Sequence, residues 1–275
     1  MTTGVGARDR AARPDPSSRA AFTPHTRRRL LLWGSASVAL CLALCAVAVQ
    51  RPKVLDGWDQ SLQLGPDSWR AAVPWLEPPL VWVSYAFGTV ASAVATLVVA
   101  GLLLRAKQYR AATYLVAAIA GTSLVTALLK HYVGLARPVV AQPIIEYASS
   151  AMPSGHASNI AAAVTAACVL SALYLRERAR RLVLGIGVLV AVVVGLDRLM
   201  LGVHTLTEVV AGYSLGVGVG LLAAFFVNPA AQAGAEHVEG SPEGATDAAR
   251  AERSADAPTS PRGPDVEGEH RNEKP

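Results

Sequence analysis

The sequence predicts an all-α integral membrane protein with six transmembrane helices in a bundle. Of its 275 residues, 52% are hydrophobic and only 16% are charged, and the mean hydropathy is +0.35. A soluble domain usually carries about 25% charged residues. Unbroken apolar runs of about 20 residues recur along the chain, which is long enough to cross a hydrocarbon core of about 30 Å. Runs without polar–apolar alternation favour helices over a barrel.

The first span is predicted close to the N-terminus. Residues 1–26 are rich in Arg, Pro, Ser and Thr and have no apolar period, so we expect a disordered cytoplasmic segment. The span follows at residues 30–49, flanked by Arg27–Arg29. A cleaved signal peptide is the alternative, because Ala46-Val47-Ala48 resembles a cleavage site. The apolar part of a signal peptide is only about 7–15 residues long, so this longer run favours a retained span.

Five further apolar runs complete the membrane domain, which covers residues 27–227. The intervening segment 50–79 is mixed in polarity and contains Trp58, Trp69 and Trp75, as is typical of the membrane interface. Residues 228–275 have no aromatic residue and many Ala, Glu, Gly and Pro, so we expect a disordered cytoplasmic tail. The five spans are predicted at residues 80–104, 111–129, 156–175, 182–198 and 205–227.

Basic residues indicate the orientation in the membrane. The N-terminal segment and the short loops 105–110 and 176–181 are basic, and the positive-inside rule places all three in the cytoplasm, with both termini. The net charge of +5 is therefore interpreted as topology rather than nucleic-acid binding. We expect a multi-pass protein of the plasma membrane. The loops that then face outward are 50–79, 130–152 and 197–204.

Ionisable side chains gather at the outward-facing ends of the spans. Charges near membrane depth are costly, so such residues indicate function. Arg and Lys suit phosphate oxygens, and a helix start at Pro153–Gly155 directs free N–H groups toward an anion. The sequence therefore predicts a phosphate site on the outer face. The ionisable residues are Lys130, Arg137, His156, Asp197, Arg198, His204 and Glu208.

Two histidines indicate the reaction. His204 and Glu208 are four residues apart and so share one helix face. A carboxylate that accepts from one ring nitrogen fixes the tautomer and leaves the other nitrogen for nucleophilic attack. His156 could protonate the leaving oxygen. We find no Asp and Glu group suited to magnesium on this face and expect phosphoryl transfer without a metal or other cofactor. The three cysteines lie in apolar runs and are interpreted as small apolar residues.

Three motifs carry a resemblance to a known family. They are "KHYVGLARP" at 130–138, "PSGH" at 153–156 and "DRLMLGVHTLTE" at 197–208. In order, spacing and position at the span ends they resemble the signature of the type 2 phosphatidic acid phosphatase superfamily, which reads K-x6-R-P, P-S-G-H and S-R-x5-H-x3-D. The resemblance covers residues 80–227. It implies a six-helix core and metal-independent phosphoryl transfer through a phosphohistidine.

The resemblance also implies a role for each matching residue. His204 would be the nucleophile, Glu208 its carboxylate partner and His156 the acid. Asp197 stands where the signature has Ser, and Glu208 stands where it has Asp. A carboxylate beside a phosphate site is repulsive unless it pairs with a cation or points away, and Arg198 and Lys130 are the cations at hand for Asp197. The implied phosphate-binding residues are Lys130, Arg137, Ser154, Gly155 and Arg198.

The predicted function is an integral-membrane lipid phosphatase that acts at the outer leaflet. Its substrate would be a phosphatidic acid-like lipid or a polyprenyl diphosphate, and membrane lipids would surround it. Two alternatives stay open: a phosphotransferase with an alcohol acceptor, and a catalytically silent protein that binds or transports lipid phosphates. Glu146 and Tyr147 lie near the predicted site, and the sequence does not decide whether they line it. Gly212, Gly216 and Gly220 predict close helix packing.

Overall fold

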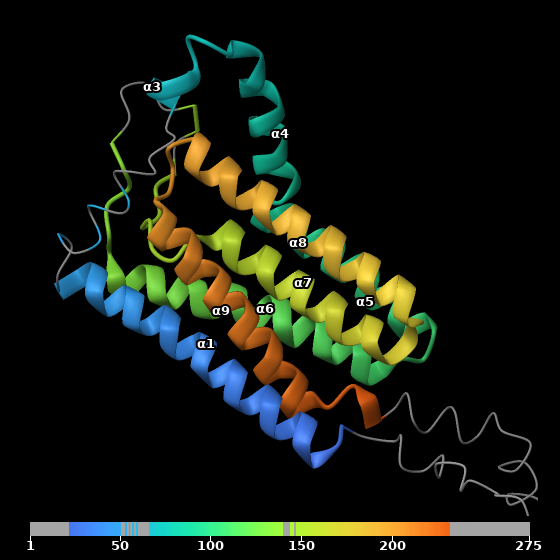
Figure 1. The fold of residues 1–275 in the computed structure, drawn as a ribbon. Helices are drawn as coiled ribbons and strands as arrows, with labels where there is room; N and C mark the ends of the chain where they lie inside the picture. The colour runs from blue at the N-terminus through green and yellow to red at the C-terminus, as the bar shows by residue number, and fades with distance from the viewer. Residues whose placement is uncertain are drawn as a thin grey trace, which may run out of the picture. The chain divides into compact units, whose positions relative to one another are not determined.

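The computed structural model describes residues 22–50, 53, 55, 57, 59, 66–139, 144–145 and 147–231. The chain divides into two units, residues 1–235 and 236–275, and every described residue lies in the first. The described residues are helical or irregular and include no strand, which confirms the predicted all-α class (Figure 1). The segments predicted to be disordered lie outside the described residues, except for 22–26 and 228–231, and so do Trp58 and Glu146.

Long helices dominate the described part of the chain. Five of them, α1, α6, α7, α8 and α9, are long and apolar enough to cross a membrane, and the bent pair α4–α5 is the sixth candidate. This agrees with the six predicted spans. The elements are α1 (Pro24–Gln50), α3 (Pro66–Trp69), the 3-10 turn η2 (Pro74–Leu76), α4 (Glu77–Ala86), α5 (Thr89–Arg105), α6 (Tyr109–Val133), α7 (Gly155–Tyr174), α8 (Glu177–Met200) and α9 (Leu206–Val227).

The second span, predicted as one continuous helix over 80–104, is broken at Gly88. The two parts of the pair are bent by 49°. Gly88 is extended (φ −69°, ψ 171°), and its N–H donates to the Tyr85 carbonyl rather than to that of Ser84. A Cβ on Gly88 would lie only 3.2 Å from the Ser84 carbonyl oxygen. The break therefore leaves the Ser84 carbonyl without its regular partner in the helix, available to a side chain.

The α8 helix begins earlier than its apolar run. Residues 176–181, predicted as a basic loop, form the cap and first turns of this helix. Glu177 pairs with Arg180 at 3.4 Å and with Arg181 at 2.9 Å. Ion pairs at the i,i+3 and i,i+4 spacing stabilise helices, so these residues extend the helix beyond the run that hydropathy detects.

The α1 helix packs closely against α9. It begins at Pro24, ahead of the predicted residue 30, and Thr23 Oγ1 accepts a hydrogen bond from the Thr26 N–H at 3.2 Å. A capping hydroxyl before a proline is a typical helix start. Farther along, a Cβ on Gly218 of α9 would lie 2.9 Å from the Gly34 carbonyl oxygen of α1. Glycines at this crossing allow the two backbones to approach each other.

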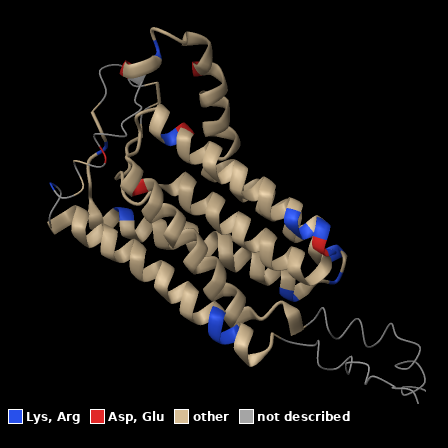
Figure 2. Cartoon of the chain, in the orientation of Figure 1, with Lys and Arg blue, Asp and Glu red and all other residues tan. Residues whose placement is uncertain are grey.

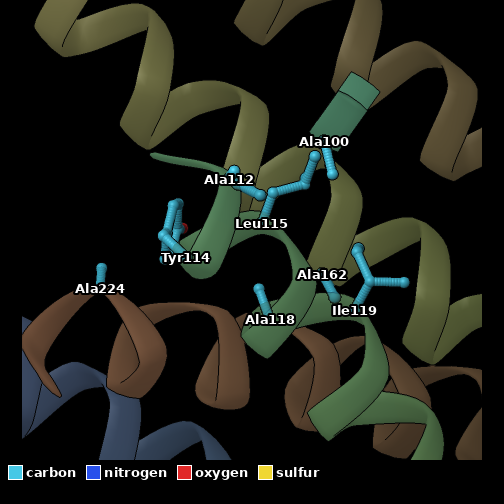
Figure 3. Close-up of a cluster of buried hydrophobic side chains, with 9 residues drawn as sticks. Ala100, Ala112, Tyr114, Leu115, Ala118, Ile119, Ala162 and Ala224 are labelled. Carbon is cyan, nitrogen blue, oxygen red and sulfur yellow. The ribbon is translucent and has the colours of Figure 1, made fainter. Parts of the chain in front are cut away.

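The predicted small-residue stripe on α9 is confirmed, and it packs against α7. A Cβ on Gly212 would lie 2.6 Å from the Ser154 carbonyl oxygen and 2.9 Å from Ala157 Cβ. A Cβ on Gly220 would lie 2.9 Å from Thr165 Cγ2. The start of α7 is therefore held directly against the start of α9. Small side chains also fill the nearby core between α5, α6, α7 and α9, where alanines predominate (Figure 3).

The two ends of the bundle differ in their ionisable residues. The ends of α6 and α8 and the starts of α7 and α9 lie at the same end, because consecutive helices run in opposite directions (Figure 1). Lys and Arg also gather at the start of α1 and the start of α8, at the opposite end (Figure 2). The chain segments that carry the three motifs are thus brought together by the fold.

Candidate active site

The structure brings all three motifs into contact at one end of the bundle. Arg137, in the loop after α6, places its NH1 3.2 Å from Nε2 of His204. Arg198, in the last turn of α8, places its NH1 3.4 Å from Nε2 of His156 at the start of α7. Lys130, in the last turn of α6, lies beside the start of α7, since a Cβ on Gly155 would be 3.9 Å from Lys130 Cε.

His204 and Glu208 form the best-defined pair in this site. Nδ1 of His204 lies 2.7 Å from Oε2 of Glu208, and both side chains are 3% exposed. The same carboxylate oxygen accepts from the Thr205 N–H at 3.2 Å, while Thr205 Oγ1 accepts from the Glu208 N–H at 3.4 Å. This reciprocal capping box holds the carboxylate at the start of α9. Because a carboxylate only accepts, Nδ1 carries the hydrogen and Nε2 has a free lone pair.

The other ring nitrogen of His204 faces a cation. The lone pair on Nε2 can accept the hydrogen bond from Arg137 NH1. Burial lowers the pKa of His204 well below its usual 6.5, and the charges of Arg137, Lys130 and Arg198 lower it further. The imidazole is therefore neutral at pH 7, the form in which it can act as a nucleophile.

Backbone and hydroxyl groups of the loop between α6 and α7 fix two of the cations. Arg137 Nε donates to the Ser149 carbonyl at 3.1 Å and its NH2 donates to Ser149 Oγ at 3.2 Å. Arg137 NH1 also donates to the Val203 carbonyl at 2.8 Å. Lys130 Nζ donates to the Ser150 carbonyl. The loop therefore gathers positive charge beside His204.

Asp197 pairs with Arg198, one of the two cations expected for it. Oδ2 of Asp197 accepts from Nε of Arg198 at 2.9 Å and from its NH2 as well. Asp197 is 1% exposed and Arg198 is fully buried. Oδ1 of Asp197 has no hydrogen-bond partner among the described residues. One edge of the guanidinium is thus occupied, and NH1 is left to face the site.

His156 is held by the broken span. Its Nε2 lies 3.0 Å from the Ser84 carbonyl oxygen, which the break at Gly88 has freed. A carbonyl oxygen only accepts, so Nε2 carries a hydrogen when this bond forms. The bond orients the ring of His156.

The start of α7 supplies neutral groups. The Ser154 N–H donates to the Glu208 carbonyl at 3.1 Å, which ties the second motif to the third. The Ser154 hydroxyl is buried and makes no hydrogen bond with any described residue. The first N–H groups of a helix lack partners within it and favour an anion. The described residues contain no group of three or more His, Cys, Asp or Glu arranged to hold a metal ion.

Four contributors to this site were not assigned a role by the sequence. Ser84 and Tyr147 contact site residues, and Thr205 completes the capping box, which its T-x-x-E spacing could have indicated. Asp59 Oδ1 accepts from the Thr207 N–H at 2.9 Å at the start of α9. The contacts of Ser84, Tyr147 and Asp59 join distant segments, so no local pattern indicates them.

Two of the comparisons with known proteins concern the sequence. Residues 111–231 match the family model of the PAP2 superfamily. The chain is 35% identical to phosphatidylglycerophosphatase B of Bacillus subtilis over an alignment of 96 residues. The alignment covers 34% of this chain and 47% of that protein. The chain therefore spans about half the length of this curated relative.

A solved structure shares the fold. It is the crystal structure of a transmembrane PAP2 type phosphatidylglycerolphosphate phosphatase from Bacillus subtilis, with a TM-score of 0.59 and 24% sequence identity over 70% of this chain and 94% of that chain. The family match runs from α6 to the end of α9 and includes all three motifs. Residues 111–231 of this multi-pass membrane protein thus resemble the PAP2 superfamily, and the fold is that of a transmembrane PAP2 type phosphatase.

Proposed function

We propose that this protein is an integral-membrane phosphatase that removes phosphate from a lipid phosphate or diphosphate through a phosphohistidine on His204. The observation that carries the proposal is the pairing of His204 with Glu208, which directs Nε2 toward Arg137. A neutral imidazole with a fixed tautomer is a competent nucleophile. The three cations supply the charge that a phosphoryl group needs, since phosphoryl transfer depends mostly on positioning and electrostatics.

The reaction would proceed in two displacements. Nε2 of His204 attacks phosphorus while the bond to the lipid oxygen breaks, and His156 gives a proton to that oxygen. Lys130, Arg137 and NH1 of Arg198 bind the phosphoryl oxygens, and Glu208 stabilises the positive ring. Water then attacks the phosphohistidine, His156 takes the proton from water, and phosphate leaves. The cycle restores both histidines and consumes one water for each phosphate.

The substrate is proposed to be a membrane lipid with its phosphate on the outer side. Lys and Arg at the starts of α1 and α8 mark the opposite end of the bundle, which the positive-inside rule places in the cytoplasm (Figure 2). The site would then face the outside of the plasma membrane, with both termini inside. Phosphatidic acid-like lipids, polyprenyl diphosphates and phosphatidylglycerophosphate, the substrate named for the relative, all present a phosphate at this interface.

The proposal is tested by phosphate release from a panel of these lipids. Purified protein in detergent is expected to hydrolyse at least one of them, both without and with a chelator. His204→Ala should abolish the activity, whereas His131→Ala, an exposed histidine at the same end of α6, should not change it. No release from any lipid would contradict the proposed function. Activity that survives His204→Ala would contradict the phosphohistidine, and activity lost to the chelator would contradict metal independence.

Two further measurements separate the remaining alternatives. Product analysis with an added alcohol shows whether the phosphoryl group passes to water or to that alcohol. For topology, a cysteine at Val139, which is 94% exposed at the end that carries the site, should react with an impermeant reagent in intact cells. A cysteine at Ala106, between α5 and α6, should not react. The reverse pattern would place the site in the cytoplasm.

A further inference from the structure

One tyrosine outside the three motifs contacts residues of all three. Tyr147 belongs to the loop between α6 and α7. Its hydroxyl lies 3.1 Å from Arg198 NH1 and 3.1 Å from Ser84 Oγ of α4. Its ring lies under the guanidinium of Arg137, with Cζ 4.6 Å from the ring centroid. The ring of His156 meets it edge to face, with 6.2 Å between centroids and an interplanar angle of 77°.

The Tyr147 hydroxyl binds the one nitrogen of the Arg198 guanidinium that Asp197 does not bind. An arginine can only donate, so the tyrosine oxygen accepts from NH1 and can give its own hydrogen to Ser84 Oγ. Asp197 already holds Nε and NH2 of the same guanidinium. The two partners together engage all three nitrogens of this fully buried group. Tyr147 is thus the partner that sets the direction of the nitrogen facing the site.

The ring acts on the second arginine. A guanidinium over an aromatic face is attracted by the ring quadrupole and gains a flat surface that limits its orientations. Arg137 is otherwise held in its plane by Ser149 and Val203. The ring restrains it perpendicular to that plane. One side chain therefore orients a cation from the first motif and a cation from the third.

We propose that Tyr147 is a positioning residue that aligns Arg137 and Arg198 for a phosphoryl group, with Ser84 as the anchor of its hydroxyl. The inference rests on the proposed function. It assigns to the α6–α7 loop a part in phosphate recognition. It also gives the broken α4–α5 span two contacts with the site, since Ser84 holds His156 through its carbonyl and Tyr147 through its hydroxyl.

The experiment separates the hydroxyl from the ring. Tyr147→Phe keeps the ring under Arg137 and removes the bond to Arg198, whereas Tyr147→Leu removes both. Ser84→Ala keeps the backbone carbonyl that binds His156 and removes only the side-chain hydroxyl that binds the Tyr147 hydroxyl. Tyr132→Phe, at an 80% exposed position on α6, is the matched control. The quantities measured are KM and kcat for the lipid substrate and Ki for inorganic phosphate, with Tm in detergent as a test of folding.

We expect Ki and KM to rise about five- to ten-fold in Tyr147→Phe, because that variant loses a hydrogen bond to the charged Arg198. They should rise further in Tyr147→Leu, because that variant also loses the ring under Arg137. Ser84→Ala should change Ki in the same direction, and the double variant with Tyr147→Phe should show less than the sum of both effects. The Tyr132→Phe control should match the wild type. Unchanged Ki and KM in Tyr147→Phe would overturn the inference while leaving the proposed function intact.

A second readout does not depend on turnover. Phosphate that binds the folded protein raises its Tm with concentration, which yields a Kd. If the wild type releases phosphate from no lipid, the proposed function fails, and this Kd alone decides the role of Tyr147. A weaker Kd in Tyr147→Phe supports that role. Equal Kd values, or no binding by the wild type, overturn it.

Discussion

Asp197 and Arg198 are consecutive residues of α8, and the carboxylate of the first accepts two hydrogen bonds from the guanidinium of the second. Neither side chain is more than 1% exposed, so water does not screen this pair. Asp197 cancels one positive charge of the site. It also occupies the Nε–NH2 edge of the guanidinium, an edge that could otherwise bind phosphate with two parallel hydrogen bonds.

Asp197→Ser is therefore expected to change phosphate affinity and stability in opposite directions. The variant frees one edge of Arg198, so the Ki for inorganic phosphate should fall several-fold. Removing one partner of a buried ion pair costs about 3–5 kcal/mol, so Tm should fall in the absence of phosphate. Glu177→Gln, at the other end of α8, should leave Ki unchanged. A Ki for Asp197→Ser equal to that of the wild type would show that Asp197 does not compete with phosphate.

Glu208→Gln should lower kcat by at least about 100-fold, because an amide cannot stabilise the positive ring of His204 and can favour the wrong tautomer. Glu208→Asp keeps the charge but is one methylene shorter, and it cannot reach both His204 Nδ1 and the Thr205 N–H as Glu208 does. We expect it to retain an intermediate kcat. Thr205→Val, which removes the cap but not the carboxylate, should mainly lower Tm. A wild-type kcat in Glu208→Gln would rule out the proposed pair.

The pH dependence should reflect the neutral state of His204. Its pKa is lowered well below 6.5 by burial and by nearby cations, so kcat/KM should not lose half its value until well below pH 6.5. Arg137→Gln removes one of those cations and should move this acid limb to higher pH, whatever its effect on the absolute rate. An acid limb at the same pH in both proteins would contradict the assignment.

The same pKa shift has a consequence for stability. The unfolded chain takes up a proton on His204 below its ordinary pKa of 6.5, while the folded protein resists protonation. The contribution of His204 to the free energy of unfolding is therefore fully present above pH 6.5. It is lost progressively as the pH falls from 6.5 toward the lower pKa of the folded protein. His204→Ala should show a smaller acid destabilisation in chemical denaturation.

Gly88→Val tests the link between the broken span and His156. A Cβ at Gly88 would lie 3.2 Å from the Ser84 carbonyl oxygen and 3.7 Å from Nε2 of His156. The added side chain should displace the hydrogen bond between them, and kcat should fall by about ten-fold if protonation of the leaving group is impaired. Gly101→Val, where no atom lies within 4 Å of the added Cβ, is the control for the β-branched residue in α5. Equal kcat values for the two variants would contradict the link.

The sequence predicted the elements whose causes are local. Apolar length located the spans, and motif spacing paired His204 with Glu208. The predicted shared helix face is wrong, because α9 begins at Leu206 and His204 lies in the loop before the N-cap Thr205. The ends of α1 and α8 were not predicted because capping and ion pairs extend them past the apolar runs. The bend at Gly88 could not be predicted, because a glycine in an apolar run is as compatible with a straight helix as with a broken one.

The contacts of Tyr147 and Ser84 depend on how distant segments pack. Tyr147 is 63 positions from Ser84 and 51 from Arg198 in the chain, and nothing in the neighbouring residues specifies either partner. Their meeting requires both the bend between α4 and α5 and the course of the α6–α7 loop. The motif residues could be identified from the chain alone, whereas the residues that orient them could be identified only from the fold.

In the proposed mechanism, the hydrogen bond from Arg137 to Nε2 of His204 makes capture of the substrate and unmasking of the nucleophile a single event. A phosphate that draws the guanidinium onto its own oxygens takes that donor away from the ring and exposes the lone pair next to phosphorus. A lone pair already engaged by a donor reacts slowly with alkylating or acylating electrophiles. On the proposed mechanism, Arg137 protects the enzyme from adventitious modification between turnovers and recruits the substrate when it arrives.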